Sequence, residues 1–277
     1  MPLLFHKMHG LGNDFVILDA RQSKLDPDPD WLRLVADRRK GIGCDQILVL
    51  RPASSTSSVA GYEVYNADGN KAGQCGNGVR CLGLLLTIND EVGERPFQLD
   101  GPAGPVELQH LGDKQFTVNM GRPEFVAGKV PIELPASDGE YQLQLNDRLV
   151  EFGAVSMGNP HAVVLMESLD EKLVDQLGSE LSSHPVFPAG CNAGFVVRYS
   201  ASQLELRVFE RGAGATMACG SGACAAVAVL RQRGLVGEQV RVSQPGGNLM
   251  IKWPGVGDDL WMTGSATYVY QGQLSND

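Results

Sequence analysis

The segments Gln74–Cys81, QCGNGVRC, and Ala218–Cys224, ACGSGAC, have almost the same pattern in the two halves of the chain. In each, a cysteine precedes Gly-x-Gly and an apolar run follows, over 79–88 in the first half and 223–230 in the second. This pattern predicts a tight turn that opens a helix, with the cysteine at or just before the first helical turn. Backbone amides and the positive end of the helix dipole meet there. The turn therefore favours a thiolate and can hold a carboxylate or an enolate-like anion.

The bulk composition excludes several classes of protein. A length of 277 residues suits roughly two domains of about 100–200 residues each. With 43% hydrophobic and 20% charged residues, neither disorder nor a membrane protein is indicated. A net charge of −9 without a Lys/Arg cluster argues against a nucleic-acid partner. The first apolar run is too short for a signal peptide, and no run could span a membrane, so a cytoplasmic protein is expected.

The six cysteines do not indicate disulfides or structural zinc. The chain is too large for a disulfide-stabilised secreted domain, and no Cys-x-x-Cys pair is present. Most of the cysteines are expected to be small buried apolar residues. Burial is favoured over chemistry for Cys81 and Cys224, which fall inside the predicted helices, while Cys191 adjoins Asn192 and could line a pocket.

The two halves repeat more than the cysteine turn. Landmarks recur in the same order at a nearly constant offset: Asn13 and Asn159 (159 − 13 = 146), Gln46 and Asn192 (192 − 46 = 146), Asn66 and Glu210 (210 − 66 = 144), Cys75 and Cys219 (219 − 75 = 144). Two copies of a long repeat indicate two related α+β halves.

The element pattern agrees with two α+β halves. Besides the two helices after the cysteine turns, helices are predicted at 31–39 and 171–181, and loops at 7–13 and 156–161. Strands are predicted at 14–19, 46–50, 62–66, 97–99, 106–108, 116–119, 132–134, 141–145, 149–155, 162–166, 195–198, 204–209, 240–242, 249–253 and 261–270.

Two opposed thiols, Cys75 and Cys219, suit the transfer of a proton from one face of a tetrahedral carbon to the other. Such an inversion needs a base on one side and an acid on the other. If the carbon adjoins a carboxylate, its carbanion resembles an enediolate. The amides of Gly76-Asn77 and Gly220-Ser221 could hold that charge.

Other landmarks suit a ligand with charges of both signs. Glu210 could accept an ammonium group and Arg211 could bind a carboxylate. His161, close to Asn159, is either structural or tunes a thiol. Neutral donors and acceptors come from Asn13, Gln46, Asn66, Asn159 and Asn192.

Over essentially its whole length the sequence resembles the diaminopimelate epimerase family. The motifs that carry the resemblance are Lys7–Phe15 (KMHGLGNDF), Gly41–Gln46 (GIGCDQ), Asn66–Gly69 (NADG), Cys75–Cys81, Met157–His161 (MGNPH), Glu210–Gly212 (ERG) and Ala218–Cys224. The resemblance implies a pseudo-symmetric α+β fold, in which each half is a mixed or antiparallel sheet rolled around a central helix, with the active site in the cleft between the halves. The halves would be residues 1–119, joined by a last strand at 265–277, and residues 120–264.

The resemblance also implies a reaction and site roles. The family interconverts LL- and meso-diaminopimelate, for lysine and peptidoglycan precursors, without pyridoxal phosphate or a metal. Cys75 would take the proton from the LL isomer and Cys219 would deliver one to the opposite face. The reacting carboxylate would be bound by Gly76, Asn77, Gly220 and Ser221. The distal stereocentre would be recognised by Asn66, Asn159, Asn192 and Arg211, with further pocket contacts from Asn13 and Gln46. His161 and Glu210 would tune the thiols. Homodimers are common in the family.

The sequence departs from the family pattern at Asn70-Lys71, Cys191, Ala215 and Ser221, none of which is a proposed base. Three alternatives stay open. The chain could be another two-cysteine isomerase of the same fold, such as a proline racemase, but a monocarboxylate substrate would not need Arg211 and the asparagines to bind a distal carboxylate. A thiol-disulfide protein would leave Glu210 and Arg211 unexplained, and a binding module would not need two matched thiols.

Overall fold

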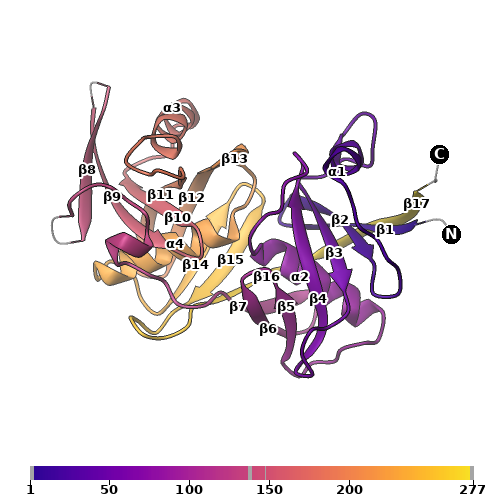
Figure 1. Cartoon of the computed structure of the whole chain (residues 1–277). Helices are drawn as coiled ribbons and strands as arrows, with labels where there is room; N and C mark the ends of the chain where they lie inside the picture. Colours follow the sequence, from indigo (N-terminus) through magenta and orange to yellow (C-terminus); the bar gives the residue numbers. More distant parts are fainter. Residues whose placement is uncertain (1–2, 137–138, 147, 275–277) are drawn as a thin grey trace. The chain divides into compact units, whose positions relative to one another are not determined.

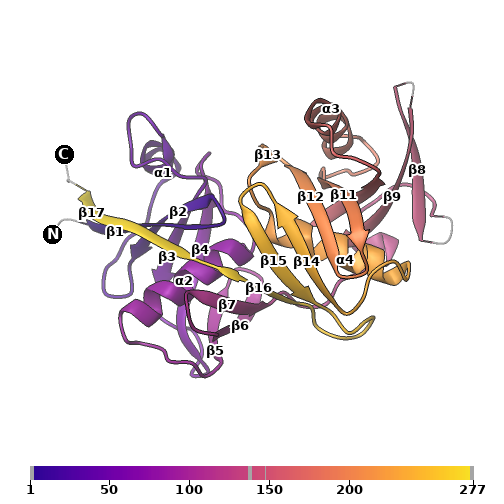
Figure 2. The same ribbon diagram turned by 180° about the vertical axis from the view of Figure 1, so that it is seen from behind.

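The chain, seen here as a computed structural model, is described over residues 3–136, 139–146 and 148–274. It divides into two compact units, of which the second is Met120–Met262 and the first contains the residues before and after it. The closing strand β17 (Thr267–Leu274) therefore belongs to the first unit, where it pairs antiparallel with β1 (Leu3–Gly10) (Figures 1 and 2). That the halves at 1–119 with 265–277 and at 120–264 are separate domains stays a prediction.

The first unit is a mixed sheet around one buried helix. Its strands pair in the order β17–β1–β2–β3–β4–β5–β6–β7, parallel at β2–β3 and β4–β5 and antiparallel elsewhere. Helix α2 (Gly76–Ile88) packs against β1, β2, β6, β7 and β17, while α1 (Pro29–Ala36) packs against β3. The other strands are β2 (Asn13–Asp19), β3 (Gln46–Arg51), β4 (Ser58–Asn66), β5 (Phe97–Gly101), β6 (Gly104–His110) and β7 (Gln115–Asn119).

The second unit repeats this plan. Its strands pair in the order β8–β9–β10–β11–β12–β14–β15, parallel at β10–β11 and β12–β14, and short β13 also pairs with β12. Helix α4 (Gly220–Gln232) packs against β9–β12 and β15, and α3 (Glu171–Ser182) against β8 and β11–β13. The strands are β8 (Glu140–Leu145), β9 (Arg148–Ser156), β10 (Pro160–Met166), β11 (Asn192–Ser200), β12 (Gln203–Glu210), β13 (Gly214–Thr216), β14 (Gln239–Gln244) and β15 (Gly247–Lys252). A 3₁₀ turn η1 (Ala127–Lys129) precedes them, and β16 (Trp261–Ser265) leads back to the first unit.

The strand registers show that the two units are copies of one plan. In the first parallel pair Phe15 lies opposite Gln46, and in the second His161 lies opposite Asn192. Both residues of the second pair follow those of the first by 146 positions (161 − 15 and 192 − 46). The predicted α+β fold of two related halves, each a sheet around a central helix, is confirmed.

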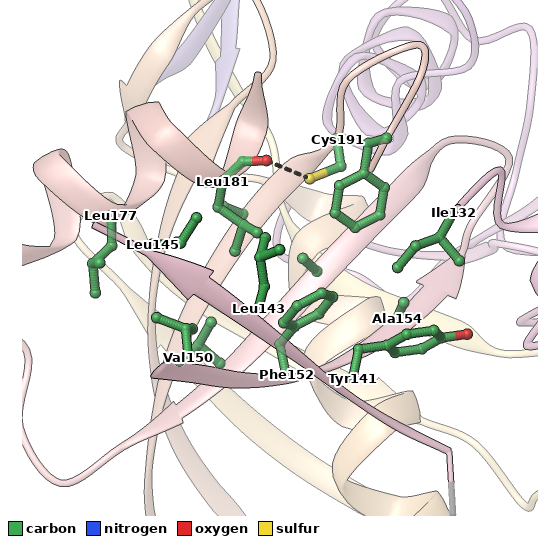
Figure 3. Close-up of a cluster of buried hydrophobic side chains, with 14 of the residues drawn as sticks. Ile132, Tyr141, Leu143, Leu145, Val150, Phe152, Ala154, Leu177, Leu181 and Cys191 are labelled. Atoms are coloured by element: carbon green, nitrogen blue, oxygen red, sulfur yellow. Dashed lines mark hydrogen bonds between the residues drawn. The ribbon is translucent and has the colours of Figure 1, made fainter. Parts of the chain in front are cut away.

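Each central helix is buried because almost every position is apolar or small. In α4 the run 222–230 consists of glycine, alanine, cysteine, valine and leucine, and all of it is buried. The outer helices α1 and α3 bury one face only, as their apolar spacing predicts. Besides the residues packed around α4, the second unit has a hydrophobic core under α3. In this core Tyr141 stacks on Phe152, and Cys191 lies next to Leu181 (Figure 3).

Three predictions about elements are wrong. The loop expected at 7–13 is mostly strand, since β1 continues to Gly10 between β2 and β17 and only Leu11 and Gly12 form the turn. No strand forms at 132–134, although Ile132 is buried in the core of Figure 3, so its apolar character reflects packing. The single closing strand expected at 261–270 is two strands separated at Ala266.

Candidate active site

Both cysteine turns adopt the predicted conformation. Cys75 is the N-cap of α2 and Cys219 is the N-cap of α4, with extended backbone angles of φ −122°, ψ 106° and φ −115°, ψ 112°. Each helix is 13 residues long and starts at the next residue. The prediction that each cysteine sits at a helix start is therefore confirmed. First-turn amides of a helix have no partner within it, which makes both positions suitable for an anion.

The second glycine of each Gly-x-Gly turn lies tightly against a side chain of the sheet in its own unit. A Cβ atom at Gly78 would lie 3.0 Å from Leu48 Cδ1, and one at Gly222 would lie 2.9 Å from Val208 Cγ2. Real Cβ atoms very rarely approach other heavy atoms so closely. The glycines thus let the start of each central helix press against the sheet of its own unit.

Cys75 lies in a polar environment and is partly exposed. Its Sγ atom is 3.9 Å from Asn13 Oδ1, and Asn77 Nδ2 donates to the same oxygen at 3.2 Å. The buried Arg80 donates in turn to Asn77 Oδ1 at 2.9 Å. The structure therefore brings Asn13, Asn77 and Cys75 together, although they come from β2 and α2.

An ionic cluster holds Asn13 from the other side. Asp45 accepts from Asn13 Nδ2 at 3.0 Å and from Arg38 at 2.7 Å. Arg38 also donates to Asp14, which is bonded to the buried Lys7 as well. Burial opposes ionisation of Asp14, but hydrogen bonds from Arg38 and Lys7 hold its pKa well below the usual value.

Gln46 and Asn66 lie together at the ends of neighbouring strands. They are opposite each other in the β3–β4 register, and Gln46 Nε2 donates to Asn66 Oδ1 at 2.9 Å. Asn192 and Arg211 are likewise joined in the second unit, where the Arg211 amide donates to Asn192 Oδ1 at 2.9 Å. The Arg211 guanidinium donates to the Ala189 carbonyl at 2.6 Å.

Cys219 differs from Cys75 in its surroundings. It is only 4% exposed, and the Gly222 amide donates to its sulfur at 3.4 Å while Ser221 Oγ lies 3.6 Å away. Burial raises the pKa of the Cys219 thiol well above 9.0, and the Glu210 carboxylate raises it further, against smaller opposing effects of Ser221 and Gly222. The Gly222 amide at the helix start does favour the thiolate, but burial and the Glu210 charge outweigh it, so the expectation of a favoured thiolate is wrong at Cys219.

Glu210 is held in place by Thr216, whose Oγ1 donates to Glu210 Oε1 at 2.6 Å across the β12–β13 pair. The Cys219 amide donates to Gln244 Oε1 at 2.8 Å. Sequence reasoning missed Thr216 and Gln244, because nothing in their local sequence places them beside Glu210 and Cys219. Asp45 and Arg38 were missed too, although Asp45 adjoins Gln46 in the same motif.

His161 is fully buried and neutral. Its Nε2 atom is 3.0 Å from Asn159 Oδ1, and burial, assisted by the Arg211 charge, lowers its pKa to about 3. Within the described ranges its Nδ1 atom has no hydrogen-bond partner. The structure thus joins His161 to Asn159, and a tuning effect on a thiol stays a prediction.

The remaining cysteines are core residues. Cys44, Cys81, Cys191 and Cys224 are at most 2% exposed, which confirms the prediction for Cys81 and Cys224. Cys191 Sγ donates to the Leu181 carbonyl inside the apolar core (Figure 3). Burial raises the pKa of the Cys191 thiol to about 12, and the idea that Cys191 lines the substrate pocket stays a prediction. Over the described part of the chain, no group of three His, Cys, Asp or Glu side chains could hold a metal ion.

Of the departures from the family pattern, Lys71 and Ala215 are bound or exposed at the surface, whereas Ser221 lies beside a proposed catalytic sulfur. Lys71 pairs with Glu63 at 2.9 Å and lies over the Tyr65 ring. Ala215 is exposed in β13. Ser221 places its hydroxyl next to Cys219, as described above.

Comparison with known proteins decides the family. The sequence profile described as diaminopimelate epimerase matches residues 5–126 and 153–269. The chain belongs to the diaminopimelate epimerase family. Enzymes of that name from Alkalilimnicola ehrlichii (43% identity, all of both chains) and Xylella fastidiosa (44% identity, 98% of this chain and 96% of the relative) are among its relatives.

Solved structures with much lower sequence identity share the fold of this diaminopimelate epimerase family member. A hydroxyproline epimerase from Agrobacterium vitis has a TM-score of 0.75 at 17% identity, covering 100% of this chain and 93% of that one. A probable proline racemase from Agrobacterium radiobacter has a TM-score of 0.73 at 16% identity, covering 99% and 93%. At these identities the likeness concerns the fold alone.

Proposed function

We propose that this chain interconverts LL- and meso-2,6-diaminopimelate by a two-base proton transfer between Cys75 and Cys219, without a cofactor. Membership in the diaminopimelate epimerase family supports the substrate and the reaction. The observation that carries the mechanism is the matched pair of cysteine N-caps, one on the central helix of each unit. The product would serve lysine and peptidoglycan precursor synthesis.

In the proposed reaction the Cys75 thiolate removes the α-proton of the LL isomer. The electron pair spreads into the adjoining carboxylate, and the first-turn amides of both helices (Gly76, Asn77, Gly220 and Ser221) hold the resulting charge. Cys219 donates its proton to the opposite face and becomes the thiolate. The raised pKa of Cys219 supports this assignment, because it keeps a proton on the thiol that must donate one. The reverse reaction exchanges the roles.

The polar residues would bind the rest of the substrate. Arg211 would bind the distal carboxylate and Glu210 an ammonium group, since both carry the complementary charge. Asn66, Asn159 and Asn192 would read the distal stereocentre, and Asn13 and Gln46 would complete the pocket. The pairing of Gln46 with Asn66 and of Asn192 with Arg211 supports a common role within each unit.

The proposal is tested by incubating the purified protein with LL-diaminopimelate in deuterated water, with no added cofactor, and separating the isomers by chiral chromatography. We expect the meso isomer to form and deuterium to enter the α-position. Proline incubated in parallel separates a proline racemase from a diaminopimelate epimerase. Conversion of proline but not of diaminopimelate would contradict the proposal.

We also propose that the protein acts in the cytoplasm as a homodimer. The substrate class supports the compartment, since it is a small charged metabolite. In the described part of the chain, no helix is long and apolar enough to cross a membrane. Exposed apolar side chains on β1 and β17 (Leu4, Val269 and Tyr270, each at least 41% exposed) offer a surface for a second copy. Sedimentation equilibrium would measure the mass, and a monomer at all concentrations would contradict the dimer.

A further inference from the structure

Four side-chain hydrogen bonds in the first unit join Arg38 to Arg80. Arg38 donates to Asp45 (2.7 Å), Asp45 accepts from Asn13 Nδ2 (3.0 Å), Asn13 Oδ1 accepts from Asn77 Nδ2 (3.2 Å), and Asn77 Oδ1 accepts from Arg80 (2.9 Å). Cys75 Sγ lies beside the middle of this chain, 3.9 Å from Asn13 Oδ1.

In this series of hydrogen bonds, Arg80 and Asp45 fix the orientation of the two amide side chains between them, those of Asn77 and Asn13. A guanidinium can only donate, so the Asn77 atom that faces Arg80 must be its oxygen. The nitrogen of Asn77 then faces Asn13, which must present its oxygen there. An ionised carboxylate can only accept, so the Asn13 nitrogen faces Asp45. Turning the Asn13 amide over would place donor against donor and acceptor against acceptor.

Asp45 is itself held in place at both of its oxygens. Oδ1 accepts from Arg38, and Oδ2 accepts from the Asp14 backbone amide at 3.1 Å as well as from Asn13. The Asp45 amide donates to Asp14 Oδ1 at 2.9 Å, so the two aspartates bind each other reciprocally. This arrangement leaves Asn13 with its oxygen towards Cys75.

We propose that Asp45, held by Arg38, is a positioning residue that fixes the Asn13 amide with its oxygen towards Cys75, so that in the unliganded protein this oxygen accepts from the Cys75 thiol. The inference deepens the proposed function, because it gives Asn13 and Asp45 a defined action on one of the two proposed acid–base groups. An amide oxygen accepts from S–H and disfavours the thiolate, whereas the amide nitrogen would favour it. Tyr62 and Cys81 also interact electrostatically with Cys75, and burial raises the pKa of both, so both are neutral.

The direct test is the rate at which iodoacetamide alkylates Cys75, measured by peptide mass mapping over a range of pH. The reagent reacts with the thiolate, and Cys75 is the one cysteine of the described residues that is not buried. In Asp45→Asn, position 45 has one oxygen in place of two, so Arg38 and the Asn13 amide compete for it and the Asn13 orientation is no longer fixed. We expect alkylation below the thiol pKa to be at least about threefold faster. An unchanged or slower rate would overturn the proposal.

Asp19→Asn is the matched control. Asp19 is at the other end of β2 and forms an equivalent pair with Arg21 at 2.6 Å. This variant should alkylate at the wild-type rate, so that a general loss of an aspartate–arginine pair is excluded as the cause. Should Asp45→Asn fail to fold, Arg38→Gln removes the group that holds Asp45, and it should change the rate in the same direction. No change there would likewise overturn the proposal.

The Asn13→Ala background shows whether Asp45 acts through Asn13. If it does, adding Asp45→Asn to Asn13→Ala has no further effect on the alkylation rate, while an undiminished effect would refute the proposed route. In the epimerase assay Asp45→Asn should lower kcat/KM and Asp19→Asn should not. The alkylation result decides this inference even if the wild-type protein does not epimerise diaminopimelate, which would refute the proposed function alone.

Discussion

The two cysteine turns have the same backbone but different surroundings. Cys75 is partly exposed beside a chain of amide side chains, whereas Cys219 is 4% exposed with the Glu210 carboxylate nearby. The same difference extends to their neighbours, because Asn13 is held by the charged Asp45 and its counterpart Asn159 by the neutral His161. Duplication has thus preserved the helix starts, while the side chains around the two sulfurs have diverged. Such divergence suits a reaction in which the two thiols begin with different tasks.

The largest effect is expected from removing either sulfur. Cys75→Ala and Cys219→Ala should each lower the rate of epimerisation by about 1000-fold or more, because a one-sided site has lost its acid or its base. Chiral chromatography of samples quenched at fixed times measures the loss of activity, and circular dichroism checks the fold.

The controls for these variants are Cys81→Ala and Cys224→Ala, which lie inside the same two helices and are fully buried. They should keep most of the activity and lose some stability. Full turnover by either catalytic variant would show that the two turns do not share one reaction.

A smaller effect is expected from Glu210→Gln, which gives the second unit an amide side chain where the first unit has Asn66. Removing this negative charge should lower the pKa of Cys219, since the carboxylate raises it. We expect kcat to fall by about tenfold or more, because the proposed role of Glu210 is to bind the substrate ammonium group and because its charge raises the Cys219 pKa. The ultraviolet absorbance of the thiolate, followed against pH in a Cys75→Ala background, measures the shift.

Glu205→Gln is the matched control on the same strand β12. Glu205 binds Tyr199 and Arg207 at the surface, so its loss should leave both activity and the Cys219 titration unchanged. A Cys219 pKa that stays the same in Glu210→Gln would mean that burial alone sets it.

The last prediction concerns acid stability and His161, whose counterpart in the repeat of the first unit is the non-titrating Phe15. Its pKa is about 3 in the folded protein and 6.5 in the unfolded chain, so the unfolded state binds the extra proton between these values. The stabilising contribution is complete above pH 6.5 and is lost as the pH falls towards 3. In His161→Gln the free energy of unfolding should therefore fall less steeply with acid, by up to about 1.4 kcal/mol per pH unit.

Urea unfolding of both proteins over this pH range measures the difference. Above pH 6.5 the two stability curves should run parallel. Equal slopes below that value would contradict a neutral buried His161.

Local sequence was sufficient to predict elements that depend on interactions between neighbouring residues. A cysteine before Gly-x-Gly and an apolar run fixes a helix start, and the prediction holds for both α2 and α4. The prediction of a loop at 7–13 was wrong because pairing with β2 and β17 stabilises β1 as a strand. Of these partners, β17 is more than 250 residues away in the chain. The state of Cys219 was also misjudged, since the helix dipole can be read from sequence but desolvation cannot.

The sequence by itself determined that two related halves each place a cysteine at the start of a central helix, and it identified the asparagines, Glu210 and Arg211 as polar landmarks of that repeat. Only the tertiary structure decided that Asp45 and Arg38 orient Asn13 and that Cys219 is buried near a carboxylate. The reason is physical. Helix starts depend on neighbouring residues, whereas burial, charge and hydrogen-bond direction depend on strands that pairing brings together from distant parts of the chain.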